Sequence, residues 1–178
     1  NVRHAVLDDE AHTWAQRREG VVERIEQAAL DIVGVQECTG DQHAELAASL
    51  PEYEWVGVAD DPGSGEHNPI GYGPAFDCEA SETIWLSESG TPESVGWDAA
   101  YPRVLTRATL WHRASERRLT AFNTHFDHVG QQARRESARR VRTALDTLPS
   151  GQPAVLLGDF NAEPESPTYE QLLATGSH

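Results

Sequence analysis

Residues 154–161 read AVLLGDFN, and this stretch decides the fold class. Its apolar half predicts a buried strand, which stops abruptly at Gly158. The strand would bring the carboxylate of Asp159 and the carboxamide of Asn161 to the edge of a sheet. Residues two apart in a strand lie on the same face, so the two side chains could converge on one ligand. The alternative interpretation is an Asx-rich turn after a strand.

Two further apolar stretches also end in polar residues. Residues 33–37 read VGVQE, and residues 122–128 read FNTHFDH. Glu37 offers carboxylate oxygens, which a hard cation such as Mg²⁺ prefers, although it could also be an exposed loop carboxylate. His125 could donate to a phosphate oxygen as charge builds in the transition state, or it could serve the fold alone. Strand ends that carry Glu, His, Asp and Asn together predict a metal-assisted phosphate site.

The residues of this site would divide the chemistry between them. Asp159 would orient or deprotonate an attacking water, and Asn161 would fix a metal or phosphate oxygen. Asp127 and His128 could orient His125 or cap the helix that follows, and the cap is the preferred interpretation.

Two other groups of residues could contact a substrate. Arginines at 134, 135, 139, 140 and 142 could grip an anion, but three of them share a helical face near Glu136, which favours a solvated surface. Trp97 and Tyr101 precede a strand and could stack on a base or a sugar, or pack beneath their own loop.

The charge of the chain is strongly negative. It has 29 acidic and 14 basic residues, a net charge of -15, and every basic residue is arginine. Such a composition is typical of proteins from a high-salt cytoplasm, where carboxylates stay hydrated and their repulsion is screened; the alternative is a GC-rich genome in which Arg replaces Lys. Either origin disfavours broad nonspecific binding to DNA, which depends on basic contacts to phosphate. Cys38 and Cys78 are too few for a disulfide framework, so we expect reduced, buried thiols.

Hydrophobic periodicity places the regular elements along the chain. Helices are expected at 14–30, 41–50 and 131–148, and Ser166 with Pro167 opens a last one. Strands are expected at 1–3, 31–36, 53–58, 70–72, 83–86, 104–111, 118–124 and 154–157, with loops at 60–68 and 90–100. The pair 104–111 and 118–124 forms a hairpin. Consecutive strands mixed with strand–helix–strand units predict mixed sheets covered by helices.

Together these segments resemble the endonuclease/exonuclease/phosphatase superfamily of DNase I-like and exonuclease III-like enzymes. The matching pieces follow the family order: NVR at 1–3, VQE at 35–37, NTH at 123–125 and GDFN at 158–161. The resemblance implies an α/β fold, a four-layer sandwich with two central mixed β-sheets flanked by helices. It also implies a single domain over 1–178 that is incomplete at both ends, because the family's closing Asp-His pair has no counterpart after Asn161.

The resemblance also implies roles for the candidate residues. Glu37 would be the principal metal ligand, with Asn1 in or beside the metal shell. Asp159 would position the nucleophilic water, Asn161 would help to bind metal and phosphate, and His125 would stabilise the phosphate. The reaction would be Mg²⁺- or Mn²⁺-dependent hydrolysis of a phosphoester by in-line attack of water. The expected substrate is a nucleic acid or a small phosphate ester, and we expect a monomer without membrane contact in a high-salt cytoplasm.

Two other functions are considered. Residues 124–130 are similar to the metallo-β-lactamase motif His-x-His-x-Asp-His, which needs a histidine where this chain has Asn123. A second alternative is a non-catalytic member of the same fold that binds a phosphorylated ligand or another protein.

Overall fold

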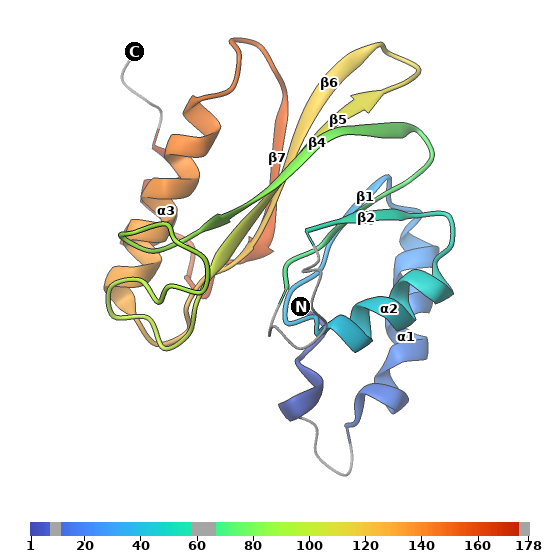
Figure 1. The fold of residues 1–178 in the computed structure, drawn as a ribbon, viewed down its shortest axis with the longest axis horizontal. Coiled ribbons are helices and arrows are strands. Elements are labelled where there is room, and N and C mark those ends of the chain that lie inside the picture. The colour runs from blue at the N-terminus through green and yellow to red at the C-terminus, as the bar shows by residue number, and fades with distance from the viewer. Residues whose placement is uncertain (8–11, 58–66, 175–178) are drawn as a thin grey trace.

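The computed structural model describes residues 1–7, 12–57 and 67–174. Two β-sheets lie face to face, and a pair of helices covers the outer side of each (Figure 1). The helices α1 (Trp14–Ala28) and α2 (Gly40–Ser49) cover the smaller sheet, and α3 (Gln131–Asp146) and α4 (Pro167–Leu173) cover the larger one. A short 3-10 helix, Ala5–Leu7, precedes α1. This arrangement confirms the expected four-layer α/β fold.

The smaller sheet has three strands in the order β1-β3-β2, and both pairings are antiparallel. The strands are β1 (Ile32–Gly34), β2 (Glu54–Val56) and β3 (Ile70–Tyr72). Residues 1–3, expected to be a strand, form none. Val2 donates one backbone hydrogen bond to Gln36, 2.9 Å long, and Arg3 then adopts a left-handed φ of 59° that prevents further pairing.

The larger sheet is mixed and has the order β4-β5-β6-β7. Its strands are β4 (Phe76–Trp85), β5 (Val104–His112), β6 (Arg117–His125) and β7 (Ala154–Asp159). The expected hairpin is β5–β6, whereas β4 begins seven residues before the predicted start at 83. The first half of β4 is polar because its outer face is exposed. There Asp77 pairs with Arg113, and Glu79 pairs with Arg118.

Side chains alternate between two cores along the larger sheet. On β6, Ala121 faces the smaller sheet and packs with Ile70 and Leu110. The next residue, Phe122, faces the opposite way and packs with Ala138 and Val141 of α3. The third core joins α1 and α2 to β1 through the following residues: Trp14, Ile25, Val33, Leu46 and Leu50. Three cores therefore separate four layers.

The position of α3 between β6 and β7 determines where the site forms. A parallel pair needs a crossover, and α3 supplies it, so the carboxyl ends of both strands reach the same edge. The register places His125 directly opposite Asp159.

The loop expected at 60–68 lies mostly outside the described residues. In the parts that the structure describes, no helix is long and apolar enough to cross a bilayer. Both cysteines are free thiols. Cys38 is buried, which raises the pKa of its thiol to about 12, whereas Cys78 is only half-buried.

Candidate active site

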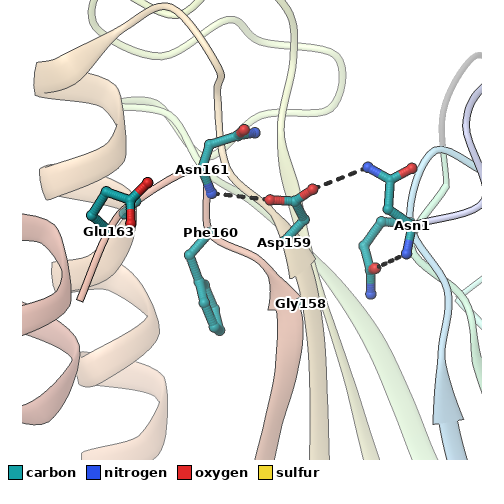
Figure 2. Close-up of a pocket in the computed structure, with 8 residues that line it drawn as sticks. Asn1, Gly158, Asp159, Phe160, Asn161 and Glu163 are labelled. Atoms are coloured by element: carbon teal, nitrogen blue, oxygen red, sulfur yellow. Dashed lines mark hydrogen bonds between the residues drawn. The ribbon is translucent and has the colours of Figure 1, made fainter.

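Gly158 allows β7 to approach β6 closely just before the site. A Cβ atom at this position would lie 2.4 Å from the carbonyl oxygen of Thr124. The strand ends at Asp159, and Asn161 lies beyond it with a left-handed φ of 44°. Strand periodicity therefore does not relate the two side chains. Instead, the backbone N–H of Asn161 donates to Asp159 Oδ1 over 3.1 Å, while the Asn161 amide points away from that carboxylate (Figure 2).

Asn1 links the two sheets at the site. Its Nδ2 donates to Glu37 Oε1 over 2.7 Å and to Asp159 Oδ2 over 3.0 Å. Figure 2 shows the side chains of Asn1 and Asp159 pointing toward each other, with Asp159 at the end of β7. The second oxygen of Glu37 accepts the backbone N–H of His4 over 3.0 Å. Two carboxylates from distant parts of the chain thus converge on one amide group.

Both carboxylates are held in the ionised form. Burial would raise the pKa of Glu37, but the hydrogen bonds from the side chain of Asn1 and the backbone of His4 oppose it, and the pKa is lowered. For Asp159, burial is likewise outweighed by the donors Asn1 and Asn161, and its pKa is lowered too. A pair of ionised carboxylates at one point favours a positive charge between them.

His125 is buried between an arginine and an amide. Its Nδ1 lies 3.1 Å from Nη1 of Arg103, and its Nε2 lies 3.0 Å from Nδ2 of Asn161. Arginine can only donate, so Nδ1 is an acceptor and the neutral ring carries its proton on Nε2. This tautomer is assigned from the hydrogen-bond network. The N–H of His125 then faces Asn161 Nδ2, which is also a donor and donates to the carbonyl oxygen of Phe126 over 2.9 Å, so Asn161 Nδ2 does not accept the His125 proton.

Asp127 does not cap α3, whose N-cap is Gly130 and has no side-chain cap hydrogen bond; it holds the turn before the helix and supports the site. Its Oδ1 accepts the backbone N–H groups of Val129 and Gly130, the residues that lead into α3. Its Oδ2 faces Arg103 Nε at 3.4 Å in a buried ion pair. The sequence analysis missed Arg103. This residue follows a proline in a loop, where arginines are commonly exposed, and only its contacts with buried residues show its role.

Gln36 and Asn123 were also missed as members of the site. Gln36 Oε1 accepts from the backbone nitrogen of Asn1 over 2.8 Å, and its Nε2 donates to Asn123 Oδ1 over 2.6 Å. Asn123 is fully buried, and its amide donates to the carbonyl oxygens of Val35 and Pro69. Both amides span the gap between the sheets. The position that a metallo-β-lactamase motif needs for a histidine ligand therefore serves to join the sheets.

Of the arginines of α3, Arg134 donates to the backbone carbonyl oxygen of Asp127 over 2.9 Å, whereas two others pair with acidic residues of their own helix. Arg139 pairs with Glu136, and Arg142 pairs with Asp146, on the exposed face of the helix. These contacts confirm the solvated face.

An open pocket of about 520 Å³ lies over the end of β7. It is lined by Asn1, Gln36 and residues 158–163.

The sequence model of the "Endonuclease/Exonuclease/phosphatase family" matches residues 1–178. The chain belongs to this family. An endonuclease/exonuclease/phosphatase from Bacteroides vulgatus has 38% identity and a TM-score of 0.88, covering 96% of this chain and 67% of its own. A mannosyl-6-phosphatase from Bacteroides thetaiotaomicron has 34% identity and a TM-score of 0.90, covering 97% of this chain and 67% of its own. Protein L388 of Acanthamoeba polyphaga mimivirus, whose function is uncharacterised, is 28% identical over 163 residues, which are 85% of this chain. The chain spans 60% of that viral relative's length.

The donor set of this endonuclease/exonuclease/phosphatase site suits a hard divalent cation. Glu37 and Asp159 offer carboxylate oxygens around one point, which leaves room for the waters and phosphate oxygens that Mg²⁺ retains. Asn1 presents its Nδ2 to this point, while its Oδ1 accepts the backbone N–H of Arg3 over 2.9 Å. Within 1–7, 12–57 and 67–174, no group of three or more His, Cys, Asp or Glu side chains is gathered closely enough to hold a metal. Two carboxylates are ligands that magnesium and manganese prefer, whereas zinc sites are typically built from cysteine and histidine.

Proposed function

We propose that the protein hydrolyses phosphate esters with the help of a divalent cation, and that its substrate is a small phosphorylated sugar. The observation that carries the proposal is the convergence of Glu37 and Asp159 on the single amide of Asn1. Two ionised carboxylates that lie close together repel each other, and a positive charge between them removes this cost in free energy. His125 and Asn161, a donor pair suited to phosphate oxygens, adjoin that point.

Glu37 and Asn1 would hold Mg²⁺ or Mn²⁺, and the bound ion would supply positive charge to the phosphate oxygens. Asp159 would orient the attacking water and accept its proton, because its lowered pKa keeps it ionised at neutral pH. The water oxygen would bond to phosphorus in line with the breaking bond to the sugar oxygen. The departing sugar alkoxide would then take a proton from solvent.

Two further side chains would hold the phosphoryl group. His125 would donate its Nε2 proton to a nonbridging oxygen, since Arg103 keeps Nδ1 as the acceptor. The Asn161 amide would donate to a second oxygen. Arg103 holds the ring of His125, and the carbonyl oxygen of Phe126 holds the amide of Asn161, before the substrate arrives. Donors positioned in advance are the condition for effective transition-state stabilisation.

Two observations support a sugar phosphate over a nucleic acid. The relative with 34% identity and a TM-score of 0.90 is a mannosyl-6-phosphatase. The net charge of -15 without a single lysine also disfavours an extended polyanion.

Hydrolysis of mannose 6-phosphate and of bis(4-nitrophenyl) phosphate tests the proposal. The full-length protein would be assayed in KCl with Mg²⁺, with Mn²⁺ and with EDTA. We expect metal-dependent release of phosphate from the monoester. Asp159→Asn should lower kcat by about 10²- to 10⁴-fold, and Glu116→Gln, in the β5–β6 turn, should retain activity.

Each other outcome has a definite meaning. Turnover that survives Asp159→Asn would place the site elsewhere. Preference for the diester would move the substrate toward nucleic acids. Binding of mannose 6-phosphate without turnover of either ester would indicate a non-catalytic member of the family.

A further inference from the structure

Arg103 holds two imidazole rings next to each other. Its Nη1 contacts Nδ1 of His125 at 3.1 Å, and its Nη2 contacts Nδ1 of His128 at 3.3 Å. Arg103 itself is only 4% exposed. Because arginine has no acceptor, His128 also carries its proton on Nε2. That N–H lies on the side of the ring opposite Arg103, and the His128 side chain is exposed. The Nε2–H of His128 can therefore donate to solvent or to a ligand, and only the guanidinium of Arg103 separates this ring from the ring of His125.

Tyr101 stacks on this second imidazole. The ring centroids of Tyr101 and His128 are 6.1 Å apart, with an angle of 19° between the planes. Tyr101 is 60% exposed, so it does not pack beneath its loop. Trp97, in the same loop, does pack there: it is half-buried, with the guanidinium of Arg140 5.8 Å from its ring centroid. We call the pair Tyr101 and His128 the aromatic ledge.

The loop that carries Tyr101 is firmly attached. Asp98 accepts the backbone N–H of Ala133, 2.6 Å away, at the start of α3. The backbone N–H of Ala100 donates to Asp127 Oδ2 over 3.0 Å. Figure 1 shows this loop, in green to yellow-green, beside the lower end of α3. A ligand would meet a preformed surface and would not have to order the loop.

We propose that the aromatic ledge is the subsite for the sugar ring of the substrate; this assignment rests on the proposed function. Tyr101 offers a flat apolar face, and the His128 N–H lies at the edge of the same surface. A pyranose has the matching pattern, with C–H groups on its faces and hydroxyl groups at its rim. The net negative charge of the protein would repel a second phosphate at the aromatic ledge. The ledge therefore favours an uncharged sugar ring.

The ratio of the kcat/KM values for two substrates tests the role of the aromatic ledge. Mannose 6-phosphate carries the ring, and methyl phosphate carries only the ester. Tyr101→Ala should lower the ratio of their kcat/KM values about three- to tenfold. Tyr101→Phe, which keeps the aromatic face, should preserve the ratio. Leu173→Ala changes a side chain that is similarly exposed (66%) on α4 and should have no effect. Equal melting temperatures would confirm that the variants are folded.

Three results would overturn the inference: an unchanged ratio, an equal loss on both substrates, or a larger loss with adenosine monophosphate than with the sugar. Ligand-observed saturation-transfer NMR separates this inference from the proposed function. If the wild type hydrolyses neither ester, the proposed function fails. Saturation of the mannose ring protons that is lost in Tyr101→Ala would still support the ledge, and identical saturation in both proteins would refute it.

Discussion

At the scale of single residues, the site depends on strained backbone held by distant partners. Glu37 has a φ of 56° and Asn161 a φ of 44°, both in the left-handed region that side chains disfavour. Such residues persist only where the surrounding contacts fix them, and they concentrate at functional sites. Here the contacts of Glu37 come from Asn1 and His4.

The buried carboxylate of Asp127 gives a prediction about pH. Burial would raise its pKa, but the N–H donors Gly130, Val129 and Ala100 and the charge of Arg103 outweigh burial and lower it. A lowered folded-state pKa stabilises the fold fully above the unfolded value of about 3.9, and the stabilisation is lost as pH falls through the folded value. We expect Asp127→Asn to cost about 3 kcal/mol at pH 7.

The same variant should lose less unfolding free energy than the wild type when the pH is lowered from 5 to 2. Urea titrations at intervals of one pH unit would measure both slopes. Glu116→Gln should keep the wild-type slope. Parallel slopes in the wild type and Asp127→Asn would show that this carboxylate does not govern acid stability.

At the scale of elements, the register of β6 and β7 positions the site. Gly158→Ala would place a methyl group 2.4 Å from the Thr124 carbonyl oxygen, so β7 would have to shift away from β6. We expect a loss of about 1–3 kcal/mol in unfolding free energy, with a fall in activity because Asp159 moves with the strand.

Gly20→Ala is the matched control, since no atom lies within 4 Å of the added methyl group and the residue is inside α1. It should stabilise the protein by up to about 1 kcal/mol. Denaturant melts and the phosphatase assay would check both variants. A Gly158→Ala protein with wild-type stability would mean that the strands can separate without cost.

The sequence predicted the elements that bury a face and missed those that do not. The strands β5, β6 and β7 have apolar runs, and the ends of β6 and β7 supplied the candidates His125, Asp159 and Asn161. The first half of β4 has exposed acidic residues instead, so its apolar pattern is too weak to reveal a strand. The buried partners Arg103 and Gln36 could not be found either, because a polar residue shows its burial only through contacts distant in the chain.

At the scale of the whole molecule, excess negative charge opposes folding. The chain carries 15 more acidic than basic residues, and bringing them together raises their mutual repulsion. Salt screens this repulsion over a distance that falls from about 30 Å at 0.01 M to about 3 Å at 1 M. Salt also weakens surface ion pairs such as Arg18–Glu45, but each such pair contributes only about 0–1 kcal/mol.

The balance of these two effects predicts that KCl stabilises the protein. The acidic excess is far larger than the paired charge that salt can weaken, so the melting temperature should rise steadily between 0.05 and 2 M KCl. Differential scanning calorimetry at fixed pH would measure the rise. Tetramethylammonium chloride at the same ionic strength is the control, because screening does not depend on the identity of the cation. A similar rise in both salts supports screening, whereas a rise in KCl alone would indicate specific binding of K⁺ by surface carboxylates. A flat or falling curve in KCl would favour the GC-rich origin of the composition, in which arginine replaces lysine without adaptation to salt.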